Sequence, residues 1–234
     1  MLATPALQPR GEGRGTPIAA VVLTGAEVDQ TAGLLTLRER QEFAVLATAE
    51  THAAVAANPI FGVLAADVVT RRVVARDKPF ALPGMSVELF AVPGKVALYL
   101  EDDNPALASE TGANVGVELV CGGRRLAYVP GAAAVPPSLR ERLDRADVIL
   151  FDGTLFRDDE MIATGTGGKS GRRMGHMPVG GTDGTLAALA GLRGRRILIH
   201  INNTNPILIE ESPERRQVEA AGFEIAEDGM EIVL

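Results

Sequence analysis

The stretch "RRILIHINNTNPIL", residues 195–208, joins an apolar run to a loop rich in side-chain amides. A short continuous apolar run is typical of a strand that is buried in an α/β sheet. His200 stands at the end of this run, and Asn202, Asn203 and Asn205 follow before a proline. A loop that only reverses the chain needs a single Asn or Gly. We therefore interpret this loop as one wall of a functional site.

Strand-like and helix-like segments alternate on both sides of this stretch. Apolar runs that predict buried strands occupy 18–24, 43–49 and 147–154, and runs with helical spacing occupy 31–40, 50–58, 136–146, 185–192 and 212–222. Short strands are expected over 68–92, a hairpin that turns on Gly122 and Gly123 over 115–131, and a closing hairpin over 223–234. This alternation predicts one α/β domain over 18–234, preceded by an extended lead-in over 1–17.

Composition narrows the function classes. The chain of 234 residues is 46% hydrophobic, and its net charge of −7 argues against nonspecific binding to nucleic acid or to anionic membranes. No run reaches the roughly 18 apolar residues that a membrane span needs, and residues 1–17 lack the apolar core of a signal peptide. The single Cys121 excludes an intrachain disulfide and is expected to be a small buried strand residue. The cytoplasm is the expected compartment.

Polar residues gather where the predicted strands end, which is where α/β folds carry their sites. They are Glu27, Asp29 and Gln30 after the first strand, Asp152 and Thr154 after "VILF", His176 in a Gly-rich loop, and His200. Two of them also have a plain structural interpretation, since Asp29 can cap a helix and Asp152 can form a turn. His52 in an Ala-rich helix is interpreted as incidental, and residues 158–160 as a solvated helix start.

Taken in order, "VVLTGAEVDQTAGLLTLRERQEF" (21–43), "FDGT" (151–154), "GHMPVGG" (175–181) and "HINNTNP" (200–206) resemble the PqqB family. These pyrroloquinoline quinone (PQQ) biosynthesis proteins belong to the metallo-β-lactamase superfamily, and the resemblance runs from about residue 7 to the C-terminus. It implies a four-layer αββα sandwich with metal ligands on loops at one edge. The sequence begins later than family members do. We therefore expect the first strands and the family's structural zinc segment to be absent, leaving a sheet edge that favours self-association.

The resemblance also implies a set of site residues. The superfamily signature H-x-H-x-D-H falls on Gly25, Glu27, Asp29 and Gln30, so that Gln30 stands where a histidine is expected. Asp29, His200 and Gln30 are the implied metal ligands. His176 and Asp152 are the implied catalytic residues, with His176 either a third ligand or a proton donor.

Asn202, Asn203 and Asn205 have two interpretations. In the first, they orient His200 and offer donors to a polycarboxylate substrate. In the second, they only satisfy loop carbonyls.

Two classes of function remain open on this basis. The family is regarded as an iron-dependent hydroxylase of the tyrosine ring in a Glu–Tyr-derived precursor of PQQ, so the implied cofactor is Fe(II), with Zn(II) second. The alternative is a non-catalytic protein that binds PQQ or its precursor for transport to the periplasm. Gln30 favours the alternative, because an amide is a weaker ligand than imidazole.

Overall fold

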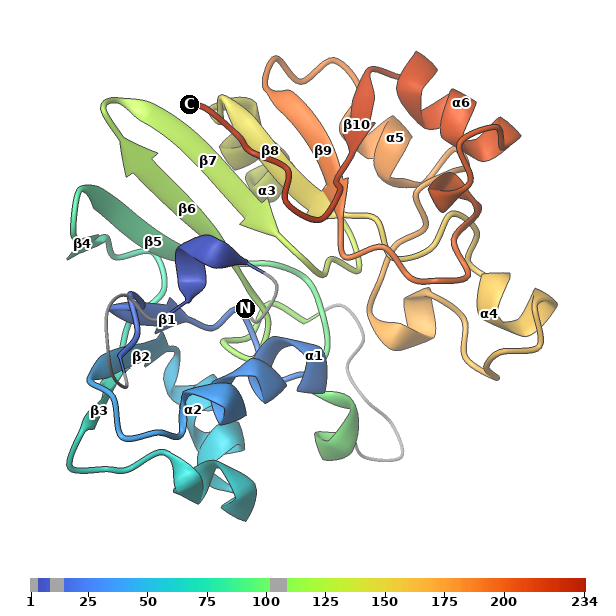
Figure 1. The fold of residues 1–234 in the computed structure, drawn as a ribbon. Coiled ribbons are helices and arrows are strands. Elements are labelled where there is room, and N and C mark those ends of the chain that lie inside the picture. The colour runs from blue at the N-terminus through green and yellow to red at the C-terminus, as the bar shows by residue number, and fades with distance from the viewer. Residues whose placement is uncertain (1–3, 9–14, 102–108) are drawn as a thin grey trace.

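Two β-sheets form the centre of the molecule in the computed structural model, which describes residues 4–8, 15–101 and 109–234 (Figure 1). The smaller sheet is parallel and has the order β1 (Ala20–Val22), β2 (Phe43–Ala47), β3 (Val69–Val73). The larger sheet has the order β10-β9-β8-β7-β6-β5-β4. Its strands are β4 (Phe80–Leu82), β5 (Met85–Ala91), β6 (Val115–Cys121), β7 (Arg124–Val129), β8 (Val148–Asp152), β9 (Arg195–Ile199) and β10 (Phe223–Ile225). Neighbours from β4 to β7 are antiparallel and those from β7 to β10 are parallel.

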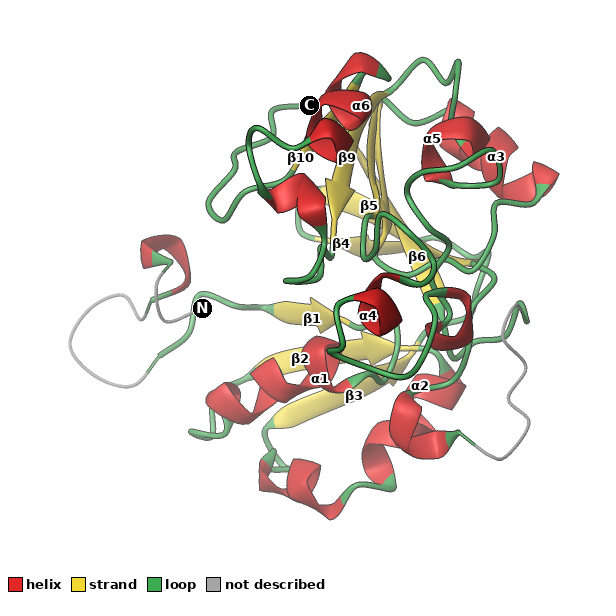
Figure 2. Cartoon of the chain, turned by 90° about the vertical axis from the view of Figure 1, so that its right-hand side faces the viewer, coloured by secondary structure: helices red, strands yellow, loops and turns green. Residues whose placement is uncertain are grey.

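Helices cover the outer faces of both sheets, so that the layers run helix, sheet, sheet, helix (Figure 2). On the smaller sheet lie α1 (Val28–Thr31), α2 (Ala49–Ala56) and the 3-10 helices Ala32–Leu37 and Pro59–Val63. On the larger sheet lie α3 (Pro137–Asp144), α5 (Thr185–Ala188) and α6 (Pro213–Ala220), while α4 (Glu160–Ala163) belongs to a loop. Further 3-10 helices span Pro5–Leu7, Leu98–Leu100, Arg172–Met174 and Pro206–Leu208. The expected four-layer sandwich is confirmed.

The strand β2 shows why the layers form. Phe43 and Val45 point into the core beneath α2, whereas Leu46 points the other way, into the core between the sheets. There it meets Val87 and Leu89 of β5. Because alternate residues of a strand face opposite sides, an unbroken apolar run requires cover on both faces. Each side chain of this size stabilises the fold by roughly 1.5–3 kcal/mol when fully buried.

One local prediction is confirmed and two are wrong. Gly122 and Gly123 have φ values of 57° and 81° and make the turn between β6 and β7, as the hairpin requires. Cys121, however, is exposed, because it is the last residue of β6, beside that turn. The expected closing hairpin does not form. β10 pairs in parallel with β9, and the residues after it build no strand. Val233 is 89% exposed there, so a return strand would gain little burial.

The predicted helices differ from the observed ones mainly in length. Residues 32–37 form a 3-10 helix rather than the α-helix expected over 31–40, in a segment where Gly33 and Thr36 have low helix propensity. α5 ends at Ala188, before the predicted end. Ser212 caps α6, since its hydroxyl accepts from the amide of Arg215. Of the predicted extended lead-in, Pro5–Leu7 forms a 3-10 turn, and residues 1–3 and 9–14 lie outside the described residues.

The predicted self-association would take place at the edge of the smaller sheet formed by β1. Among the described residues β1 pairs with β2 alone, and all three of its residues are half-buried. A strand edge of this kind is a template for pairing with another chain. We expect light scattering on the purified chain to show a mean mass that rises with protein concentration. A mass that stays at that of the monomer over the whole range would mean that this edge is covered. In the described part of the chain, no helix is long and apolar enough to cross a membrane.

Candidate metal centre

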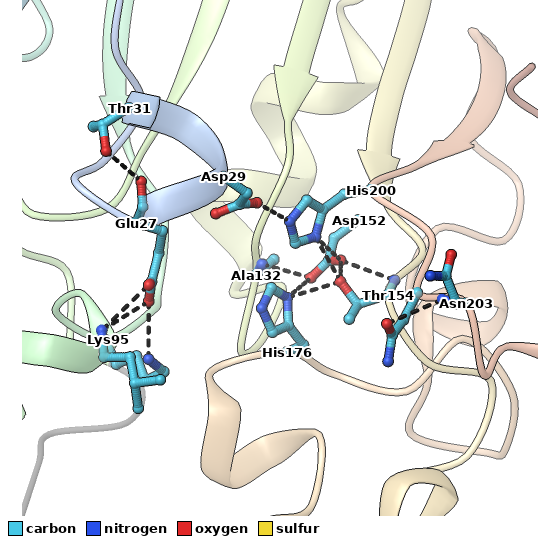
Figure 3. A network of polar contacts seen from close by, with 12 residues as sticks. Glu27, Asp29, Thr31, Lys95, Ala132, Asp152, Thr154, His176, His200 and Asn203 are labelled. Carbon is cyan, nitrogen blue, oxygen red and sulfur yellow. Dashed lines mark hydrogen bonds and ion pairs between the residues drawn. The ribbon is translucent and has the colours of Figure 1, made fainter. Parts of the chain in front are cut away.

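A pocket of about 320 Å³ opens at the edge of the sandwich where β8 and β9 end. Its lining includes Asp29 and Gln30 of α1, His176 and His200. Strands β8 and β9 are parallel, with Asp152 paired in register to Ile199. This register places Asp152 beside the residue that follows Ile199, which is His200. The fold therefore brings together side chains from three separate segments of the chain at this edge (Figure 3).

His200 lies between Asp29 and Thr154. It has a left-handed backbone conformation with φ of 55°, which takes it out of the regular alternation of β9. Its Nε2 atom lies 2.7 Å from Oδ2 of Asp29, and its Nδ1 atom lies 2.8 Å from Oγ1 of Thr154. The expectation that Asp29 and His200 meet, although 171 residues apart, is confirmed. Asp29 is not a helix cap, since the cap position of α1 is Glu27.

Asp152 is completely buried beneath the pocket and bonds to both His176 and Thr154. Its Oδ2 atom accepts from the amide of Ala132 at 2.9 Å and lies 2.7 Å from Nδ1 of His176. Its Oδ1 atom accepts from the amide of Thr154 at 3.1 Å and from the Thr154 hydroxyl at 2.6 Å. Burial raises the pKa of Asp152, but the charge of His176 and hydrogen bonds from His176, His200 and Thr154 outweigh it. The pKa is therefore held below its ordinary value.

The contacts of Asp152 and Thr154 assign the histidine tautomers. Because the Thr154 hydroxyl donates its single proton to Asp152, it can only accept from Nδ1–H of His200. The carboxylate of Asp152 likewise requires Nδ1–H on His176. In the neutral form of each ring, the lone pair is then on Nε2. The two rings stack with centroids 5.3 Å apart.

His200 gains a second proton in the metal-free site. The carboxylates of Asp152 and Asp29 raise its pKa to about 10, against the opposing effect of burial. This stabilising effect on the metal-free fold is fully present below the ordinary histidine pKa of about 6.5 and is lost as the pH rises through about 10. A metal ion at Nε2 must displace this proton.

The affinity for a metal ion should therefore depend on pH. Below pH 10, we expect the dissociation constant for Zn²⁺ to fall about tenfold for each unit of rising pH, owing to the one proton displaced from His200. Competition titrations between pH 6.5 and 8.5 against a chelator of known proton dependence would measure the slope. A pH-independent constant would mean that His200 does not release a proton when the metal binds.

The residues present fit a divalent cation. Ligand atoms of Asp152, His176 and His200 all lie within 4.8 Å of one another, and the carboxylate of Asp29 adjoins His200. Oε1 of Gln30 is buried and has no hydrogen-bond partner among the described residues, although Gln30 lines the same pocket. An unpaired buried acceptor is costly unless something else satisfies it. Imidazole with carboxylate or amide oxygen suits Zn²⁺ or Fe²⁺.

The three asparagines lie behind the site rather than in it. Asn205 is only 2% exposed, its Nδ2 donates to the carbonyl of Gly153, and its Oδ1 accepts from the amide of Ile207. Nδ2 of Asn202 donates to Thr204, and its Oδ1 accepts from the amide of Asn203. Burial excludes the predicted contact between Asn205 and a substrate. The second interpretation describes Asn205, which satisfies the carbonyls of Gly153 and Thr154. Asn202 bonds to Thr204 and to the amide of Asn203 within its own loop, and Asn203 is exposed outside this pocket.

Three further side chains depart from their predicted roles or were not singled out. Glu160 was expected to be solvated but is buried, because its carboxylate accepts from the amide of Phe156 and the hydroxyl of Thr204. Thr154 was noted only as a polar strand end, yet it contacts both histidines. Lys95 was missed entirely, although it lines the pocket. Their roles depend on contacts with residues far along the chain. His52, interpreted as incidental, lies outside the pocket, with Nε2 3.0 Å from the carbonyl of Arg72.

Comparison with known proteins places these features in a family. The model of the β-lactamase superfamily domain matches residues 1–201. Coenzyme PQQ synthesis protein B of Methylobacterium sp. (strain 4-46) is 54% identical, and the match covers 100% of this chain and 79% of the relative. The protein of the same name from Rhizobium meliloti (strain 1021) is also 54% identical, over 97% of this chain and 75% of the relative.

Solved structures agree with the sequence relatives. The crystal structure of Zn²⁺-bound PqqB from Methylobacterium extorquens has a TM-score of 0.96 and 50% identity, and it covers 100% of this chain and 79% of that one. The metallo-β-lactamase fold protein YhfI from Bacillus subtilis has a TM-score of 0.61 at 13% identity, over 91% of this chain and 76% of that one. The second similarity supports the fold alone.

Proposed function

Because this chain belongs to the family of coenzyme PQQ synthesis proteins B, within the β-lactamase superfamily, we propose that its pocket is a metal-dependent hydroxylase site. Family membership places the chain in the biosynthesis of PQQ. The proposed substrate is the tyrosine ring of a Glu–Tyr-derived precursor. The observation that carries the proposal is the convergence of Asp29, His176 and His200, from three separate segments, on one pocket.

The proposed metal is Fe(II), held by Asp29 and His200 with Gln30 beside them. An iron ion bound there would activate O₂, a chemistry typical of sites with two imidazoles, one carboxylate and open positions. Here His200 supplies one imidazole and Asp29 the carboxylate, and Gln30 stands in place of the second imidazole. The reaction inserts one oxygen atom of O₂ into a ring C–H bond, and the other leaves as water after taking up two electrons and two protons from a reductant.

The protein's own residues have distinct tasks in this scheme. Asp152 and Thr154 hold both imidazoles by their Nδ1 protons, so that each presents Nε2. His176 lines the pocket and is the residue to which we assign proton transfer, through Nε2. The Asp152 carboxylate stabilises the positive charge that His176 gains when it accepts a proton, since their atoms lie 2.7 Å apart.

The test is oxygen incorporation. The chain would be loaded anaerobically with Fe(II), given the cross-linked Glu–Tyr amino acid and a reductant, and exposed to ¹⁸O₂. We expect a product that is heavier by one ¹⁸O atom, and no such product from the Zn²⁺-loaded chain. If the loaded chain binds the amino acid tightly but leaves it unchanged, the hydroxylase proposal is wrong. The carrier alternative would then stand.

One observation favours that alternative, a protein that binds PQQ or its precursor for transport. Gln30 occupies the place of an expected histidine, and its buried Oε1 is a weaker ligand than imidazole. The two proposals differ in whether the site holds Fe(II) strongly enough for catalysis.

The substitution Gln30→His addresses this difference. We expect it to increase the affinity for Fe(II) by more than about tenfold, because it adds an imidazole beside Asp29 and His200. Anaerobic titration of both proteins would measure the change. Gln41→His, at a half-buried position outside the pocket, serves as the control and should leave the affinity unaltered. Equal, negligible binding by the unaltered chain and by the Gln30→His variant would argue against a competent metal site.

A further inference from the structure

Residues 94–101, here called the bridging segment, bind the start of α1, the helix that carries Asp29. The ammonium group of Lys95 lies 3.0 Å from Oε1 of Glu27, two residues before Asp29. The amide of Leu98 donates to both carboxylate oxygens of Glu27, each at 3.2 Å. The hydroxyl of Tyr99 donates to the carbonyl of Ala26 at 2.7 Å. Three separate residues of the segment thus hold the start of α1.

The same segment also forms ion pairs with, and packs against, the loop that carries His176. Oε2 of Glu101 lies 3.0 Å from Nζ of Lys169 and 2.9 Å from Nη1 of Arg173. Gly175, directly before His176, has φ of 87°, and a Cβ atom there would lie 2.9 Å from Cγ of Lys95. The aliphatic part of Lys95 therefore packs on the backbone next to His176, and only glycine leaves room for it.

Lys95 joins these two sets of contacts. Its ammonium lies 2.8 Å from Oε1 of Glu101 as well as beside Glu27, and the side chains of Lys95 and Glu101 are each only 7% exposed. Burial raises the pKa of Glu101, but hydrogen bonds from Lys95, Lys169 and Arg173 outweigh it and lower the pKa to about 2. The carboxylate of Glu101 is therefore charged at neutral pH. Because water is largely excluded, removal of one partner leaves a buried charge uncompensated.

We propose that Lys95 is a positioning residue of the metal centre, setting the distance between the loop of Asp29 and the loop of His176. It contacts no ligand atom itself. It acts through Glu27 on one side (Figure 3) and through Glu101 and Gly175 on the other. The inference rests on the proposed metal site and adds to it a residue outside the superfamily signature. Metal ligands must be held in place by such outer contacts to bind well.

Lys95→Met tests the proposal, since it keeps the apolar stem and removes the charge. Lys78→Met, at an exposed position, is the matched control. We expect Lys95→Met to weaken Zn²⁺ binding by about 10- to 100-fold and to alter the visible absorption of the Co²⁺-substituted protein. Lys78→Met should change neither. A Co²⁺ spectrum and Zn²⁺ affinity equal to those of the unaltered chain would overturn the proposal, whatever happens to the melting temperature.

A double-substitution cycle with Glu27→Gln identifies the route. If Lys95 acts through Glu27, the second substitution should add little to the loss of affinity caused by the first. Fully additive effects would overturn that route. Should Lys95→Met fail to fold, Glu27→Gln and Glu101→Gln remove charges with little change of shape and should weaken Zn²⁺ binding in the same direction.

These experiments distinguish a failure of the Lys95 proposal from a failure of the proposed hydroxylase function. Zn²⁺ and Co²⁺ binding are measured without substrate or O₂, so an inactive chain still tests Lys95. If the chain binds no metal at all, the ring ¹⁵N and ¹H resonances of His176 and His200 in the metal-free protein provide the readout. Lys95→Met should shift those of His176 and Lys78→Met should not. Unshifted resonances would overturn the proposal.

Discussion

Replacement of His200 by alanine should abolish metal binding, with a loss of more than about 100-fold in affinity for Zn²⁺ or Fe²⁺. Loss of an outer contact to a ligand already costs about 10- to 100-fold, and His200 supplies the proposed ligand itself. It is also the residue whose Nε2 atom meets Asp29. Equilibrium dialysis with metal analysis would measure the change directly.

His52→Ala is the control for this experiment. His52 is half-buried on α2, outside the pocket, and among the described residues its Nε2 has a hydrogen-bond contact only with the carbonyl of Arg72. It should bind metal like the unaltered chain. Undiminished binding by His200→Ala would place the metal elsewhere in the protein and contradict the proposed centre. An equal loss in His52→Ala would point to a general effect on folding instead.

Asp152→Asn should both destabilise the fold and weaken the metal site. All four groups around the Asp152 carboxylate are donors, from Ala132, His176 and the amide and hydroxyl of Thr154. An asparagine offers one acceptor oxygen in place of two and turns an NH₂ group toward two donors. We expect a loss of about 3 kcal/mol in the free energy of unfolding. Metal affinity should fall by roughly 10- to 100-fold, because the one remaining oxygen cannot accept from both His176 and Thr154, the residue that holds His200.

Urea unfolding and metal titration would measure the two effects, with Asp144→Asn as the control. Asp144 lies at the end of α3 with its side chain 43% exposed, and its substitution should change neither quantity appreciably. Folding lowers the pKa of Asp152. Its contribution is therefore present above the ordinary aspartate pKa and is lost as the pH falls through the lowered value. An Asp152→Asn protein of unchanged stability at neutral pH would contradict this account of the buried carboxylate.

The layered fold could be predicted from local patterns because those patterns record burial. Runs such as 43–49 and 147–154 are apolar on both sides of a strand, and they can be stable only between two covered faces. The hairpin at Gly122 and Gly123 was likewise predictable, since the turn needs residues that tolerate positive φ. The absence of the closing hairpin could not be predicted. The segment "MEIVL" has a strand-like composition, but in the structure it has no partner strand and no buried surface to pack on.

The site was predictable only in part. The order of "FDGT", "GHMP" and "HINN" pointed by resemblance to Asp152, His176 and His200, and the register of parallel strands explains why two of them are neighbours.

What the sequence determined by itself was the set of strand ends at which polar side chains appear. The tertiary structure alone decided which of them face one pocket, that Asn205 is buried behind it, and that Thr154 and Lys95 hold its parts together. Sequence patterns report how each segment is buried, whereas these roles arise from contacts between segments as far apart as Asp29 and His200, whose distance in space no local pattern contains.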